Sequence, residues 1–316
     1  MFFTDWEGPW ILTDFAFELT AAIFNNDRFF KNLSIYDDYL AYEVKREGYE
    51  AGYTLKLLVP FLAAAGVRNE DLAKIARDLA HFVPDSKFAM NFLQKRWRPI
   101  VISTSYLQYL KTTAHILGVD GDLHGTEIDF DSVEIDEDLK KDILDSVDVI
   151  ASLVGDELYL YLDEFFKRKE IKKLMDDIHA IGAGEKARIL QDYCRKYEID
   201  CPVAVGDSIS DYKMFESARK SGGVAVAFNG NRYAIEHADI AVVSDSAVSE
   251  AAVVFLIKVF GIDKVKRFEN LPEKLKKLLD RTNTEIFIVR EHDVDEVVAK
   301  SQKMRVKLRG EAGKLG

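Results

Sequence analysis

Two aspartates in the stretch 203–211, Val-Ala-Val-Gly-Asp-Ser-Ile-Ser-Asp, have the type and spacing of metal ligands. The apolar run before them predicts a buried strand that ends at Gly206 and passes into a loop. In open α/β sheets, ligands bind at the carboxyl ends of the strands. Asp207 and Asp211 would repel each other there unless a cation lay between them, and carboxylates beside a phosphate commonly hold Mg²⁺. The alternative is that both acids only cap the following helix.

Other polar residues stand where a strand is predicted to end or a helix to begin. Asp5 ends the β-prone run at the N-terminus. Ser103 and Thr104 follow a second apolar run, and the Ser-Thr-Ser sequence leaves open which hydroxyl is the relevant one. Lys186 lies at the start of a helix predicted to extend to about Tyr197. Because strand ends in a doubly wound sheet converge on one crevice, we expect these residues to be neighbours.

Together these residue types suit the transfer of a phosphoryl group. A carboxylate can attack phosphorus to form an aspartyl-phosphate, which divides hydrolysis into two easier steps. Mg²⁺ would neutralise oxygens on the nucleophile and on the phosphate. A lysine and a hydroxyl could hold the remaining phosphoryl oxygens as charge moves onto the leaving group.

The elements that position these residues are strands alternating with helices, which predicts an α/β fold with a doubly wound parallel sheet. Strands are expected at about 1–4, 98–105, 202–205, 223–228 and 239–243, and a candidate short strand lies at 127–130. Each of the first three ends in the polar residues described above, so the sheet would collect them at one edge.

The pattern also divides the chain into domains. Residues 1–13 and 96–261 form the sheet core, with a helical insertion at about 130–180. Residues 14–95 show helical periodicity and no strand signal, which predicts a helical block inserted after the first strand. Residues 262–316 read as a helix, a strand and a charged helix, and we expect a small C-terminal appendage.

Composition limits the classes of function. The 316 residues are 48% hydrophobic and 31% charged, which is ordinary for a globular protein with a sizeable core. A formal charge of −11 argues against general nucleic-acid binding. The two cysteines and six histidines show no zinc spacing. No signal peptide or membrane-spanning stretch is evident, so we expect a cytoplasmic protein.

The motifs resemble those of the haloacid-dehalogenase-like (HAD) superfamily of aspartate-nucleophile phosphohydrolases. The four matching motifs are Asp5-Trp6-Glu7-Gly8, Ile102-Ser103-Thr104, Lys186 and the run from Gly206 to Asp211. The run 223–228 is similar to a closing strand of phosphoserine-phosphatase-type members, and the resemblance covers roughly residues 1–260. It implies a HAD-like Rossmannoid core with an inserted α-helical cap of the C1 type.

The resemblance also implies roles for single residues. Asp5 would be the nucleophile and a Mg²⁺ ligand, together with the main-chain carbonyl of Glu7 and the carboxylates of Asp207 and Asp211. Lys186 would orient the nucleophile and offset phosphate charge.

Further roles concern substrate binding. Ser103, or Thr104 if the register differs by one, would bind the phosphate. Asp14 stands where phosphoserine-phosphatase-like members use an acid toward the substrate. Arg46, deeper in the helical block, is a weaker candidate for a carboxylate or phosphate contact.

One position departs from the family pattern. Family phosphatases usually have Asp two residues after the nucleophile, as general acid and base, and this chain has Glu7. Glu can transfer protons if the geometry allows it. A change in reach of one methylene could nonetheless slow the reaction by orders of magnitude.

The expected function is a Mg²⁺-dependent phosphatase that hydrolyses a small phosphorylated metabolite. Two alternatives are a catalytically weak binding or regulatory protein and a sugar-phosphate mutase. The regulatory alternative draws on a similarity to archaeal HAD-like proteins named as accessory subunits (subunit R) of energy-converting hydrogenase A. We expect no nucleic-acid partner and no membrane insertion, whereas a protein partner could dock on residues 130–180 or 262–316.

Overall fold

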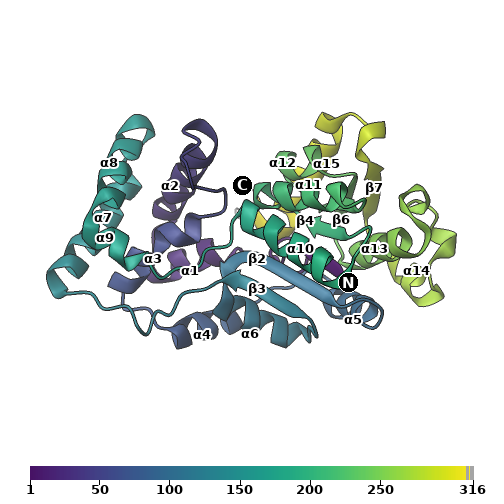
Figure 1. Ribbon diagram of the computed structural model, residues 1–316, viewed down its shortest axis with the longest axis horizontal. Coiled ribbons are helices and arrows are strands. Elements are labelled where there is room, and N and C mark those ends of the chain that lie inside the picture. The colour runs from purple at the N-terminus through teal and green to yellow at the C-terminus, as the bar shows by residue number, and fades with distance from the viewer. Residues whose placement is uncertain (311–312, 314–316) are drawn as a thin grey trace.

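A single seven-stranded sheet forms the centre of the protein, in a computed structural model that describes residues 1–310 and 313 (Figure 1). The strand order is β3-β2-β1-β4-β5-β6-β7; the first six strands are parallel and β7 is antiparallel to β6. The strands are β1 (Phe2–Thr4), β2 (Pro99–Tyr106), β3 (Asp122–Thr126), β4 (Val203–Gly206), β5 (Val224–Phe228), β6 (Ile240–Ser244) and β7 (Thr284–Ile288). The predicted doubly wound α/β sheet is confirmed.

Helices cover both faces of the sheet, because the parallel strands are apolar on both sides. Phe2 and Phe3, for example, are consecutive buried residues of β1 that point into different cores. One face carries α10 (Ala183–Tyr197), α11 (Tyr212–Lys220), α12 (Arg232–Glu236) and α15 (Val294–Arg309). The other carries α5 (Ser86–Gln94), α6 (Leu107–Leu117), α13 (Val248–Phe260) and α14 (Glu273–Leu279).

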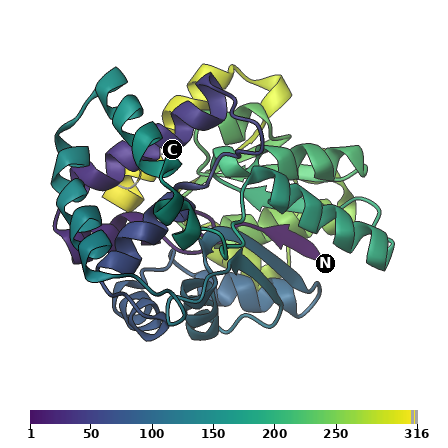
Figure 2. The same cartoon turned by 60° about the vertical axis from the view of Figure 1, so that its left-hand side comes forward.

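The remaining helices come from two distant parts of the chain and pack together as a helical lobe beside the sheet (Figure 2). They are α1 (Phe15–Phe24), α2 (Asp27–Asp38) with the π-helical turn Tyr39–Glu43, α3 (Thr54–Ala64), α7 (Glu137–Ser152), α8 (Gly155–Lys167) and α9 (Lys169–Leu174), whereas α4 (Asn69–Leu79) packs mainly against α6. Aromatic rings join the two parts: Phe61 stacks on Phe165 at 5.2 Å between centroids, and Tyr39 on Tyr159 at 3.8 Å. The helical insertion predicted at about 130–180 therefore shares a core with the helical block predicted at 14–95.

The third strand differs from its prediction. The candidate strand at 127–130 is not β3, which lies at Asp122–Thr126 on the edge of the sheet. Its sequence, Asp-Leu-His-Gly-Thr, has no alternating or continuous apolar pattern, because an edge strand is only partly buried. The pairing of β3 with β2 therefore decides its position.

Residues 262–309, expected as part of an appendage, are built into the sheet domain. β7 pairs with β6 and extends the sheet, and α15 packs against β6 and α12. In the described part of the chain, no helix combines the length and apolarity needed to cross a membrane.

Candidate active site

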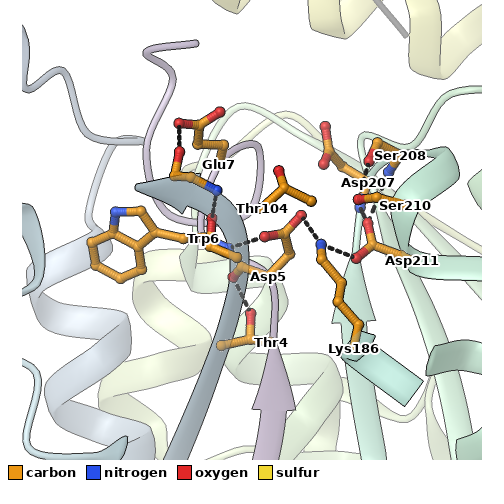
Figure 3. Close-up of polar contacts among 12 residues, drawn as sticks. Thr4, Asp5, Trp6, Glu7, Thr104, Lys186, Asp207, Ser208, Ser210 and Asp211 are labelled. Atoms are coloured by element: carbon orange, nitrogen blue, oxygen red, sulfur yellow. Dashed lines mark hydrogen bonds and ion pairs between the residues drawn. The ribbon is translucent and has the colours of Figure 1, made fainter. Parts of the chain in front are cut away.

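Three buried aspartates meet at the carboxyl ends of β1 and β4 (Figure 3). The two strands are paired with Thr4 opposite Val205, so Asp5 and Asp207 leave the sheet at nearly the same level. One carboxylate oxygen from each of Asp5, Asp207 and Asp211 lies within 4.8 Å of the others. Their side chains are almost completely shielded from solvent. The sheet therefore brings together the acids that the sequence placed far apart.

Lys186 links two of these acids. Its Nζ lies 2.8 Å from Asp5 Oδ2 and 2.8 Å from Asp211 Oδ1, and the side chain is fully buried. Burial alone would lower the pKa of Lys186, but the charges of Asp211 and Asp5 raise it above its usual range. Burial raises the pKa of Asp5, helped by Asp211 and Asp207 and opposed by Lys186. An ammonium group between two carboxylates fixes their orientation and offsets their repulsion.

Asp211 makes the capping contacts that the sequence offered as one alternative, and it also lies in the acid cluster. Its Oδ2 accepts hydrogen bonds from the main-chain N–H groups of Asp207 (2.9 Å) and Ser208 (3.0 Å), which shapes the loop before α11. Its Oδ1 faces Lys186. Gly206 leaves the room for this arrangement, because a Cβ there would lie 2.3 Å from Asp211 Cγ.

Two arginines of α15 also reach the site, and the sequence analysis did not single them out. Arg305 Nη1 lies 2.6 Å and Arg309 Nη1 3.2 Å from Asp207 Oδ2. Arg305 is 3% exposed. The only sequence signal is their spacing of four residues, which puts both on one face of a helix. Basic residues at this spacing also occur on solvent-exposed helix faces, so the spacing could not have identified a site.

Glu7 lies on the opposite side of Asp5 from Lys186 (Figure 3). Its Oε1 accepts hydrogen bonds from the N–H of Phe15 (3.2 Å) and from the hydroxyl of Ser105. Burial raises the pKa of Glu7, and the charge of Asp14 adds to this effect, while Ser105 and Arg309 oppose it. Ser105, the third residue of the Ser-Thr-Ser run, thus helps to hold the Glu7 side chain in place.

The structure separates the two hydroxyls considered for phosphate binding. Thr104 lines a cavity of about 140 Å³ together with Asp5, Glu7 and Asp207. Ser103 is buried, and its Oγ accepts a hydrogen bond from the N–H of Ser105 at 3.2 Å.

Asp14 and Arg46 have different surroundings. Asp14 lines the same cavity, and its Oδ1 also caps α1 by accepting the N–H of Phe17 at 3.1 Å. Arg46 forms an ion pair with Asp163 of α8 inside the helical lobe, and the structure does not bring it to the cavity.

A loop of the helical lobe, residues 44–53, is docked on the sheet domain beside the cavity. Glu50 Oε2 accepts a hydrogen bond from the N–H of Gly184 in the first turn of α10, and Glu50 Oε1 lies 3.2 Å from Lys213 Nζ. Gly184 allows this approach, because a Cβ there would lie 2.1 Å from Glu50 Oε1. Gly184 lies two residues before Lys186 in α10. The same helix therefore contacts the loop and carries Lys186 into the site.

The loop is braced from within the lobe by Asp37. Its carboxylate accepts hydrogen bonds from the hydroxyl of Tyr49 (2.6 Å), the N–H of Gly52 (3.2 Å) and the hydroxyl of Thr54 (2.9 Å). Gly52 in turn lies against Thr104, because a Cβ added at Gly52 would be 3.0 Å from Thr104 Cγ2, which is a tight contact.

No protein-family model and no curated protein matches the chain. Among solved structures, a phospho-aspartyl intermediate analogue of phosphoserine phosphatase is similar at 16% identity, with 76% of this chain and 91% of that chain covered and a TM-score of 0.48. The structure of gene product AF1437 from Archaeoglobus fulgidus is similar at 58% identity, over 100% of this chain and 98% of that chain, with a TM-score of 0.94. The chain therefore belongs to the family of gene product AF1437 from Archaeoglobus fulgidus.

Proposed function

We propose that the protein is a Mg²⁺-dependent phosphatase that hydrolyses a small phosphomonoester through an aspartyl-phosphate on Asp5. One observation carries the proposal: Asp5 is buried at a strand end with Asp207 and Asp211 within 4.8 Å and Lys186 bound to it. The motif resemblance to the HAD superfamily supports the same assignment.

The donor set suits Mg²⁺, because the clustered ligand atoms are all carboxylate oxygens. Asp5, Asp207 and Asp211 would hold the ion, and the resemblance adds the main-chain carbonyl of Glu7. When bound, the ion would supply positive charge that offsets repulsion between the nucleophile and the phosphoryl oxygens.

The chain's own residues would then perform the two steps. A carboxylate oxygen of Asp5 forms a bond to phosphorus while the bond from phosphorus to the ester oxygen breaks. Lys186 would keep the Asp5 carboxylate oriented, and the hydroxyl of Thr104, a residue that lines the cavity, would donate to a phosphoryl oxygen. Water then attacks the aspartyl-phosphate, releasing inorganic phosphate and restoring Asp5.

Glu7 is the candidate for moving protons in both steps. Its carboxyl group lines the cavity that contains Asp5, and two hydrogen bonds hold it there. Glu7 would give a proton to the departing alcohol oxygen and later take one from the attacking water. The helical lobe would act as the cap that closes over these groups through the loop at 44–53.

Phosphate release from p-nitrophenyl phosphate tests the proposal. Release should require Mg²⁺ and disappear in Asp5→Asn, whereas Asp200→Asn, an equal change at an exposed aspartate before β4, should retain it. Equal release by Asp5→Asn would refute the proposal. Binding of beryllofluoride with Mg²⁺ but without any turnover would instead favour a binding or regulatory protein. Isomerisation of a sugar phosphate with little release would favour a mutase.

A further inference from the structure

The last helix of the structure contributes two arginines to the group of acids proposed to hold the metal. Arg305 and Arg309 are one helical turn apart on α15, and both donate through Nη1 to Asp207 Oδ2. Arg305 Nη1 also lies within hydrogen-bonding distance of the carbonyl oxygens of Asp207 (3.1 Å) and Asn229 (2.9 Å). Arg309 Nε donates to the carbonyl of Leu12 at 3.0 Å. These contacts fix both guanidinium groups beside the site.

The arginines change the charge that a metal ion would meet. With all groups ionised, the three clustered aspartates face three cations, which are Lys186, Arg305 and Arg309, and Glu7 and Asp14 also line the cavity. The affinity of a carboxylate site for a hard divalent cation depends on the charge of its ligands. A nearby unit charge in a partly buried site changes the interaction energy by an amount that depends steeply on distance and screening. The two arginines should therefore weaken the attraction of these acids for Mg²⁺.

A phosphoryl group in the cavity would add negative charge beside the arginines. Arg309 lines the cavity beside Asp5 and Thr104. Its Nη2 lies 3.8 Å from Asp14 Oδ2, which is an ion pair and too long for a hydrogen bond. The guanidinium fork matches phosphate oxygens in shape and charge. An anion in the cavity and a cation among the acids would thus stabilise each other.

We propose that Arg305 and Arg309 are positioning residues that make Mg²⁺ binding depend on a phosphoryl anion in the cavity. The inference rests on the proposed function, since it assumes that the acids bind Mg²⁺. Through their contacts with Asp207, the arginines keep the metal site weak until the anion arrives. The two ligands then bind together, and the coupling must be reciprocal.

Calorimetric titration of the full chain with Mg²⁺, with and without inorganic phosphate at matched ionic strength, measures this coupling. For the wild type we expect phosphate to tighten Mg²⁺ binding by about tenfold or more, the size of a typical coupling between sites. Titration with phosphate, with and without Mg²⁺, should give the same factor. Equal Mg²⁺ affinities in the two titrations would overturn the inference and leave the proposed function standing. Absence of Mg²⁺ binding in all conditions would overturn both.

Arg309→Gln separates coupling from a merely structural role. This variant should bind Mg²⁺ alone more tightly than the wild type and lose most of the effect of phosphate, while Arg309→Lys should keep part of it. Arg305→Gln should act in the same direction, and if it fails to fold, Arg309→Gln decides. Lys303→Gln removes a charge from an exposed position on the same helix and serves as the control. If Arg309→Gln and Lys303→Gln both behave as the wild type, the arginines only attach α15 to the sheet and the inference is wrong.

Discussion

The main chain at Gly8 lies directly against the carboxylate of Asp207. A Cβ at Gly8 would be 2.3 Å from Asp207 Cγ, and the residue has a φ of +91°, which side chains rarely allow. The loop after β1 and the loop after β4 are therefore in contact at the point where two of the clustered acids emerge. Conformation and space both require glycine here.

Gly8→Ala should consequently damage the site as well as the fold. Gly118→Ala is a matched control, because Gly118 has a φ of +83° and nothing within 4 Å of a Cβ. Both changes should cost roughly 1 kcal/mol or more for backbone strain. Only Gly8→Ala should cost several kcal/mol in urea denaturation and also lose Mg²⁺ binding, because it displaces Asp207. Similar losses in the two variants would contradict the importance of this contact.

Glu50→Ala should weaken docking of the helical lobe. The substitution removes the hydrogen bond to Gly184 and the ion pair with Lys213, and a charge-assisted hydrogen bond of this kind contributes about 1.5–3 kcal/mol. KM for p-nitrophenyl phosphate should rise about tenfold or more, and amide hydrogen exchange in residues 44–53 should accelerate. Glu47→Ala, at an exposed position in the same loop, should change neither quantity. Unaltered exchange in Glu50→Ala would show that other contacts hold the loop.

Glu7→Gln should slow phosphate release about 10²–10⁴-fold, which is the usual contribution of a general acid or base. Gln keeps the length of the side chain and can still accept from Phe15 and Ser105, so the fold should be retained. Binding of beryllofluoride with Mg²⁺ should persist and serves as the check on the site. Glu7→Asp tests reach, since it shortens the side chain by one methylene. A fully active Glu7→Gln would assign proton transfer to another group.

Glu250 provides a prediction about stability and pH. Its carboxyl group, in the first turn of α13, is fully buried, and within the described residues neither oxygen has a hydrogen-bond partner. Burial raises the pKa of Glu250 well above its ordinary 4.5. For an acid with a raised pKa, the folded state keeps its proton while the unfolded state loses it. The resulting stabilisation is therefore complete below pH 4.5 and is lost as the pH rises toward the folded-state pKa.

Glu250→Gln removes this titration while nearly keeping the shape of the side chain. Between pH 5 and the folded-state pKa, the unfolding free energy of the wild type should fall relative to the variant by about 1.4 kcal/mol per pH unit. Urea denaturation of both proteins at several pH values measures the difference. If the two stability curves ran parallel, the raised pKa of Glu250 in the folded state would be contradicted.

The sequence alone determined the core of the fold and the central acids. Short apolar runs that end in Asp5 and Asp207 identify parallel strands, and the carboxyl ends of such strands must lie at one edge of the sheet. Lys186 was placed by the same logic, because the helix before β4 returns its first turn to that edge. These local patterns suffice because the topology of a parallel sheet puts the strand ends at one edge.

Packing between distant segments decided the rest. Whether Ser103 or Thr104 lines the cavity depends on which side chain of β2 faces the residues that surround it. The contact of Glu50 with Gly184 joins a lobe loop to the sheet domain beside the cavity. No periodicity within either segment could have indicated that contact.

Arg305 and Arg309 show most clearly what could not be predicted from the sequence. In the sequence they belong to a charged helix that looks solvated, next to lysines that are exposed in the structure. They become part of the site only because β7 pairs with β6 and α15 then packs along the sheet toward Asp207. The sequence by itself determined which acids gather at the strand ends. Only the tertiary structure decided which cations contact these acids, because that depends on where a helix distant in the sequence packs against the sheet.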